Sequence, residues 1–159
     1  MKLGIMSDSH GRVGRVRDAL AILDAAGAEA IVHCGDVGGI EVLEEFAGRR
    51  CWFVWGNTDY PHPTWRASVE ALGLPWPDGP VEFTAAGRRI AVYHGHEPGF
   101  EGAIRSGRSE YLLHGHSHRK ADYRVGPTRV INPGALHRVG VPTVAILDVQ
   151  SDDLSFLEV

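Results

Sequence analysis

The pattern of apolar and polar positions divides the chain into two halves with different periodicities. In the first half, three continuous apolar runs predict buried strands at 2–7, 30–33 and 51–55. Between them, apolar residues recur every three or four positions and predict two helices, one over 13–26 that ends at Gly27 and one over 40–47 that ends at Gly48. Continuous apolar strands that alternate with helices are typical of a parallel sheet covered on both faces.

The second half has the alternating periodicity of antiparallel strands. Three hairpins are predicted, and they pair 81–85 with 88–93, 121–125 with 129–131, and 143–149 with 154–159. A short strand at 111–113 and helical segments at 65–72 and 100–106 complete the set. We therefore predict an α/β protein in which two mixed β-sheets pack face to face with helices outside. No repeat or linker interrupts the pattern, so residues 1–159 are expected to form one domain.

Residues 60–80 fit neither half of the pattern. Five prolines punctuate this segment, so it is predicted to run over the surface or to form one wall of a substrate cleft. Its two tryptophans, Trp65 and Trp76, stand away from basic residues, which favours a packing role over stacking on nucleic-acid bases.

Composition and charge narrow the class of protein. Hydrophobic residues make up 43% of the chain and charged residues 23%, which is ordinary for a soluble domain. The net charge of −4 argues against binding to duplex nucleic acid through the phosphate backbone. The N-terminal residues enter a strand pattern without signal-peptide features, and no segment has the length of a membrane span. We expect a cytoplasmic protein without a membrane partner, in which Cys34 and Cys51 are buried free thiols.

Candidate chemistry is concentrated where the predicted strands end. Three histidines stand at alternate positions in 113–118, and in extended backbone His116 and His118 point to the same face. Each of the three predicted parallel strands is followed by an oxygen ligand, namely Asp8, Asp36 and Asn57. Because the carboxyl ends of such strands meet at one edge of a sheet, these side chains are expected to converge there.

These positions provide a mixed set of oxygen and imidazole ligands without a thiolate. The set is Asp8, His10, Asp36, Asn57, His94, His116 and His118. Such ligands suit Mn²⁺, Fe or Zn²⁺ in a catalytic role better than they suit a structural zinc site. Seven ligands exceed what one ion requires, and one carboxylate can bridge two ions, so the set favours a two-metal centre.

Five short motifs in this set resemble those of the calcineurin-like metallophosphoesterases. They are Asp8-Ser9-His10, Gly35-Asp36, Gly56-Asn57, His94-Gly95-His96 and Gly115-His116-Ser117-His118, and the turn Asn132-Pro133-Gly134 is similar as well. The motifs stand in the family's order and span nearly the whole chain. More narrowly, the chain resembles the small single-domain phosphodiesterases of bacteria and archaea. The resemblance implies a four-layer α/β/β/α fold, with two β-sheets packed as a sandwich between helices.

The resemblance also implies a role for each ligand. One ion would be held by Asp8, His10 and His118, the other by Asn57, His94 and His116, and Asp36 would bridge the two. A hydroxide between the ions would attack phosphorus, its pKa lowered by both cations. Mn²⁺ is the expected metal, with Fe, Zn²⁺ and Ni²⁺ as alternatives. Asn57 and Arg12 are candidate contacts for a small phosphoester substrate.

One position departs from the better-known family pattern. Many relatives carry a histidine directly after the motif asparagine, where it helps to protonate the leaving group, whereas this chain has Thr58 followed by Asp59. Asn57 and His96 are the candidates for catalytic contacts, although a position at the rim of the site explains His96 more simply. Threonine cannot donate a proton as imidazolium does, so the sequence leaves the general acid unassigned.

The expected function is that of a divalent-metal-dependent phosphodiesterase acting on a small or nucleotide-like phosphoester. One alternative is an interaction scaffold, similar to the eukaryotic retromer subunit that keeps this fold, and another is a nuclease. The intact ligand set disfavours the scaffold, and the acidic net charge disfavours the nuclease. Whether the chain forms a homo-oligomer stays open.

Overall fold

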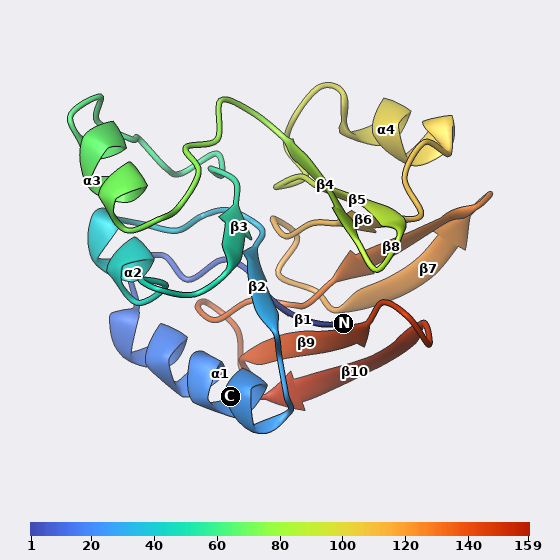
Figure 1. The fold of residues 1–159 in the computed structure, drawn as a ribbon, viewed down its shortest axis with the longest axis horizontal. Coiled ribbons are helices and arrows are strands. Elements are labelled where there is room, and N and C mark those ends of the chain that lie inside the picture. Colours follow the sequence, from blue (N-terminus) through green and yellow to red (C-terminus); the bar gives the residue numbers. More distant parts are fainter.

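The structure is a computed structural model and describes residues 1–159. Ten strands in two sheets form its centre (Figure 1). The strands are β1 (Lys2–Met6), β2 (Ala30–His33), β3 (Cys51–Phe53), β4 (Val81–Ala85), β5 (Arg88–Val92), β6 (Tyr111–Leu113), β7 (Ala121–Val125), β8 (Thr128–Asn132), β9 (Thr143–Asp148) and β10 (Asp153–Glu158). One sheet has the order β10-β9-β1-β2-β3 and the other the order β4-β5-β6-β8-β7.

Four helices lie outside the sheets. They are α1 (Val13–Ala25), α2 (Ile40–Glu44), α3 (Trp65–Ala71) and α4 (Phe100–Ser106). Every predicted segment is present with the predicted type. The largest difference is at α2, which ends three residues earlier than predicted because the chain continues in tighter turns, with Phe46 N–H donating to the Leu43 carbonyl at 3.0 Å. None of the four helices is long and apolar enough to cross a bilayer.

Alternation along the central strands produces the layers. In β1, Leu3 and Ile5 pack into the core between the two sheets, whereas Gly4 between them faces Leu23 of α1. In β6, Leu113 enters the same core and Leu112 packs under α4. Helix α1 therefore covers one outer face and α4 the other, which confirms the predicted sandwich between helices (Figure 1).

The strand directions bring the carboxyl ends of two parallel sets to one edge. Strands β1, β2 and β3 are parallel neighbours, and so are β5, β6 and β8 in the second sheet. All three predicted hairpins form, and the last of them, β9 with β10, joins the first sheet antiparallel to β1. The loops that leave the parallel strands carry the motifs, so the fold places them side by side.

Candidate metal centre

The first group of predicted ligands is compact. Ligand atoms of Asp8, His10, Asp36 and His118 all lie within 4.8 Å of one another. His118 Nε2 lies 3.2 Å from Asp8 Oδ1, and His10 Nε2 lies 3.6 Å from Asp36 Oδ2. Two carboxylates and two imidazoles converging on one point match the coordination preferences of a divalent transition metal.

The second group adjoins the first at Asp36. His94 Nε2 lies 3.0 Å from Asn57 Oδ1 and 3.5 Å from Asp36 Oδ2, and the His94 and His116 ring centroids are 5.0 Å apart. The same Oδ2 atom of Asp36 therefore faces His10 of the first group and His94 of the second. All seven residues predicted from the sequence come together, with one carboxylate between the two groups.

The backbone at this site is unusual. Five of the eight non-glycine residues with positive φ in the chain are predicted ligands, namely Asp8 (55°), His10 (45°), Asp36 (52°), His116 (66°) and His118 (58°). This left-handed region is uncommon for residues with a Cβ, and such conformations cluster at functional sites because the surrounding structure must hold them. The strained backbone points the side chains back toward the sheet edge.

The His94 ring has a defined orientation. Its Nδ1 lies 2.8 Å from the Cys34 carbonyl oxygen, which can only accept, so Nδ1 carries a proton and donates it. Nε2 faces the oxygens of Asn57 and Asp36; burial opposes a proton there, but hydrogen bonding to the Asp36 carboxylate outweighs burial and raises the pKa of His94. A bound cation would take the place of that proton between Nε2 and the two oxygens, and a backbone carbonyl on the opposite nitrogen is the usual support for a metal-ligating histidine.

Two buried ligand atoms lack hydrogen-bond partners in the protein. They are Oδ1 of Asp8 and Nε2 of His10. Asp8 is fully buried, and this burial raises the pKa of its carboxyl group above the ordinary value. Burying a carboxylate oxygen without a hydrogen bond is costly, whereas a bound cation would satisfy both atoms and keep the carboxylate ionised. The residues present therefore fit divalent metal ions.

The Asp36 side chain is stabilised in its ionised form. Burial opposes its ionisation, but the His94 ring and the Thr58 backbone N–H, which donates to Oδ1 at 3.0 Å, outweigh that effect and hold its pKa well below the ordinary value. Its second oxygen is the one between the two ligand groups. One oxygen of Asp36 is thus fixed by the β3 loop while the other faces the ligands.

Two further carboxylates, which the sequence did not indicate, tie the ligand loops together. Asp59 accepts hydrogen bonds from the backbone N–H groups of Val37 (3.0 Å), Gly38 (2.8 Å) and Gly56 (2.8 Å) and so joins the loops after β2 and β3. Glu97 accepts from the N–H groups of His94 (2.8 Å) and Gly95 (2.7 Å). The sequence signal for these residues is a carboxylate two or three positions after a ligand, where it can accept hydrogen bonds from the backbone N–H groups of its own loop.

His33 is buried behind the first metal loop. Ser9 donates its hydroxyl hydrogen to the Val37 carbonyl at 3.0 Å and accepts from His33 Nε2 at 2.9 Å, while His33 Nδ1 accepts the Gly35 N–H at 3.3 Å. Both ring nitrogens are used by the neutral form, and burial lowers the pKa of His33 to about 3. His33 therefore supports the loops that carry Asp8 and Asp36.

We expect His33 to make the protein sensitive to acid. An unfolded histidine has a pKa near 6.5, so between pH 6.5 and about 3 the unfolded chain binds a proton that the folded chain does not, and stability falls with pH. From pH 7 to pH 5 this corresponds to about 2 kcal/mol of unfolding free energy. Denaturant unfolding of wild type and His33→Phe at both pH values measures it. An equal loss in both proteins would contradict this assignment, and exposed His62→Phe is the control.

Three other residues, Arg12, His137 and Thr58, lie at the rim. Arg12 precedes α1, and its Nη2 lies 3.5 Å from Nε2 of His137, whose ring centroid is 5.9 Å from that of His10. Thr58 Oγ1 lies 3.5 Å from His10 Nδ1. The sequence indicated Arg12 but gives no signal for His137, because only the tertiary fold brings the 135–140 segment back to the first ligand group.

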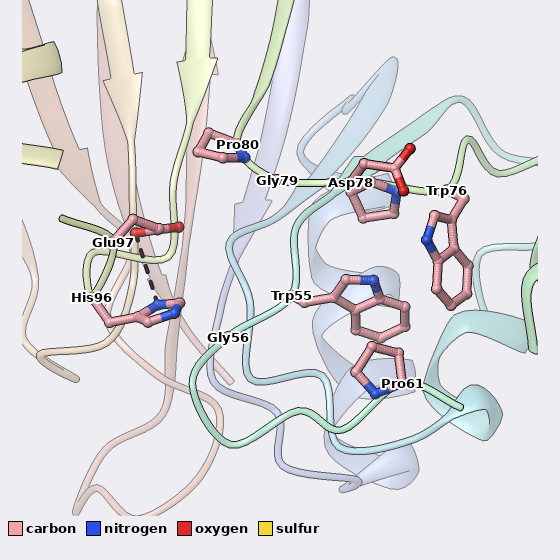
Figure 2. Close-up of a pocket in the computed structure, with 10 residues that line it drawn as sticks. Trp55, Gly56, Pro61, Trp76, Asp78, Gly79, Pro80, His96 and Glu97 are labelled. Atoms are coloured by element: carbon pink, nitrogen blue, oxygen red, sulfur yellow. Dashed lines mark ion pairs between the residues drawn. The ribbon is translucent and has the colours of Figure 1, made fainter. Parts of the chain in front are cut away.

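His96 lies on the opposite side, away from Arg12. Its ring is 36% exposed, and Nδ1 lies 3.8 Å from Glu97 Oε2. The ring centroid is 5.4 Å from that of His94 and 6.2 Å from that of His116. His96 lines a cavity whose opposite wall includes Trp55 and, from the proline-rich segment 60–80, Trp76 (Figure 2).

Comparisons with known proteins agree with this geometry. The family model of the calcineurin-like phosphoesterase superfamily domain matches residues 1–152. A phosphodiesterase of Methanocaldococcus jannaschii is 29% identical over 161 residues, which covers 96% of each chain. The solved structure of an archaeal phosphodiesterase has a TM-score of 0.89 and 27% identity, with all of both chains covered. The structure of Vps29 from Entamoeba histolytica, solved with Zn²⁺, has a TM-score of 0.70 and 18% identity. The match covers 99% of this chain and 91% of that chain and shows a common fold.

Proposed function

Because the chain belongs to the calcineurin-like phosphoesterase superfamily, we propose that it is a divalent-metal-dependent phosphodiesterase for small or nucleotide-like phosphoesters. The observation that carries the proposal is the pair of ligand groups on either side of Asp36, in which buried atoms of Asp8 and His10 make no hydrogen bond within the protein. The similarity to the M. jannaschii phosphodiesterase over 96% of the chain supports the same reaction.

The ligands divide between two ions in this proposal. Asp8, His10 and His118 would hold one ion, Asn57, His94 and His116 would hold the other, and Asp36 would be the ligand common to both. Mn²⁺ is the first choice and Fe, Zn²⁺ and Ni²⁺ are alternatives, since all accept this mixture of imidazole and oxygen. When bound, two such ions activate water as a nucleophile and stabilise charge on the phosphoryl oxygens.

The remaining residues orient the ligands and the substrate. Asp59 and Glu97 hold the ligand loops through backbone N–H groups, so the imidazoles and carboxylates keep their positions before substrate binds. Asn57 presents an amide, and Arg12 a guanidinium at the rim, as donors to phosphate oxygens. Preorganised donors of this kind contribute because they require no rearrangement during the reaction.

The scaffold alternative has a structural relative in Vps29, whose likeness to this chain concerns the fold. A scaffold has no physical need for buried carboxylate and imidazole atoms without partners, and these atoms lower stability in the absence of cations. The ligand geometry therefore favours an enzyme.

We expect diesters to be hydrolysed at least as well as monoesters. A monoester dianion requires a dense set of cationic side chains. At this site, Arg12 lies at the rim, in hydrogen-bond contact with His137, which is beside the ligand His10. Measuring kcat/KM for bis(p-nitrophenyl) phosphate and p-nitrophenyl phosphate with Mn²⁺, Ni²⁺, Zn²⁺ and Mg²⁺ tests both the metal dependence and the ester class. A preference for monoesters over several leaving groups would overturn the assignment to diesters.

Rates are expected to depend steeply on leaving-group acidity. Position 58 is threonine, and Asp59 beside it is engaged with three backbone N–H groups, so neither residue replaces the usual histidine. A positioned general acid contributes about 10²–10⁴-fold, which alkyl and nucleoside esters would lose and activated aryl esters would not need. A series of aryl diesters of graded phenol pKa measures the slope in wild type and His96→Ala. A shallow slope in wild type that steepens in His96→Ala would identify His96 as the acid and refute this reading.

A further inference from the structure

A cavity of about 340 Å³ lies beside the candidate metal centre. Gly56, which precedes Asn57, and His96, which is two residues after His94, both line it. Since the His96 ring centroid is only 6.2 Å from that of His116, the cavity adjoins the proposed ligands. Its volume is at the lower end of the range of roughly 300–1,000 Å³ that is typical of small-molecule sites.

Aromatic and proline side chains form one wall of this cavity. Trp55 and Trp76 contact each other edge to face, with ring centroids 5.3 Å apart, and Pro61 lies against the same side. Figure 2 shows these three side chains on one side of the cavity and His96 and Glu97 on the other. Both tryptophans also pack against the buried core beneath the helices, so their rings are fixed in place. Such a wall suits a flat ring.

The charged side chains of the lining are acidic and disfavour an anion. Its charged residues are Asp78 and Glu97, and neither lysine nor arginine lines the cavity. Arg66 lies outside, 3.4 Å from Asp78 Oδ2 and 5.8 Å from the centroid of the Trp76 ring. A phosphate group is therefore favoured at the metal ligands and disfavoured here. Because Arg66 pairs with Asp78, and the N–H groups of His94 and Gly95 donate to Glu97, both carboxylates already have partners and the cavity suits an uncharged group.

We infer that this cavity binds a planar, uncharged aromatic group of the phosphoester, either a nucleobase or an aryl ring, while the phosphate lies at the metal ligands. The inference deepens the proposed phosphodiesterase function by naming the class of ester group that the enzyme accepts. Binding of the ring alone requires neither metal nor turnover, so the cavity can be tested separately from the reaction.

Isothermal titration calorimetry with adenosine and with benzyl alcohol tests the cavity and distinguishes a nucleobase from an aryl ring. We expect at least one of them to bind wild type with a Kd in the millimolar range or below. Trp76→Leu should weaken this binding at least tenfold. Trp52→Leu is the matched control, because Trp52 stacks on Phe83 at 3.8 Å between centroids and does not line the cavity. Benzoate, the anion matched to benzyl alcohol, should bind at least tenfold more weakly than benzyl alcohol.

Kinetics provide the second readout. In Trp76→Leu, we expect KM for bis(p-nitrophenyl) phosphate to rise at least tenfold while kcat changes little. Absence of binding by both neutral probes, or equal binding and equal KM in wild type and Trp76→Leu, would overturn the inference. The neutral probes could bind in a Trp76-dependent way while no phosphoester is hydrolysed with any metal. That result would contradict the proposed phosphodiesterase activity but support the aromatic binding site.

Discussion

Asp36→Ala is expected to lose both metal ions and at least about 10³-fold in phosphodiester hydrolysis, because bound metals contribute several kcal/mol and each 1.36 kcal/mol is a factor of ten. One oxygen of Asp36 faces His10 and His94 at 3.6 and 3.5 Å, so its removal takes a ligand from both groups. His118→Ala removes a ligand from the first group and should weaken mainly one ion. Elemental analysis of the purified variants measures the difference.

Asp18→Ala is the matched control for this experiment. Asp18 is an exposed carboxylate on α1 without an ion-pair partner, so its removal should change neither metal content nor activity. Retention of one full equivalent of metal by Asp36→Ala would show that the two groups do not share this carboxylate.

Gly56→Ala is expected to damage the metal centre through packing alone. A Cβ atom on Gly56 would overlap both the backbone nitrogen and the Oδ1 atom of Asp36, and the backbone cannot yield as a flexible side chain can. Overpacking of this kind costs about 1–3 kcal/mol in stability. Displacement of a ligand or of its supporting contacts typically costs about 10–100-fold in metal affinity or activity.

Thermal unfolding with and without added Mn²⁺, together with kcat/KM, measures both effects of Gly56→Ala. Gly140→Ala is the matched control, since a Cβ atom there meets nothing within 4 Å and the residue is exposed. Wild-type metal affinity in a folded Gly56→Ala protein would mean that Asp36 can move without loss, contrary to its proposed bridging position.

The ligands were predictable because two simple regularities coincide. Apolar runs located the strands, and residues that follow parallel strands meet at one sheet edge, so Asp8, Asp36 and Asn57 converged as predicted. The layers were predictable for the same reason, since alternate residues of the strands pack into different cores.

Other features depend on tertiary contacts that periodicity does not encode. The β9–β10 hairpin was predicted, but its pairing with β1 was not, because a hairpin pattern does not specify the neighbouring strand. Residues 51–55 looked like one strand, yet β3 ends at Phe53, so Trp55 leaves the sheet and lines the cavity. Trp76 packs on the core as predicted and lines the cavity as well.

The supporting carboxylates show why the site was only partly predictable. The three hydrogen bonds of Asp59 go to backbone N–H groups, two of them on a loop more than twenty residues earlier, and such partners carry no side-chain signature. The left-handed φ values at the ligands are equally hidden, since aspartate and histidine occupy ordinary backbone regions in most sequences.

We propose that two divalent ions, held on either side of Asp36, make this chain a phosphodiesterase. The most direct measurement is a titration of the metal-free protein with Mn²⁺, in which bound metal per chain and hydrolysis of bis(p-nitrophenyl) phosphate are followed in the same samples. We expect activity to be absent without metal and to reach its maximum at two bound ions per chain. Full activity with one ion per chain, or activity that survives complete removal of metal, would contradict it.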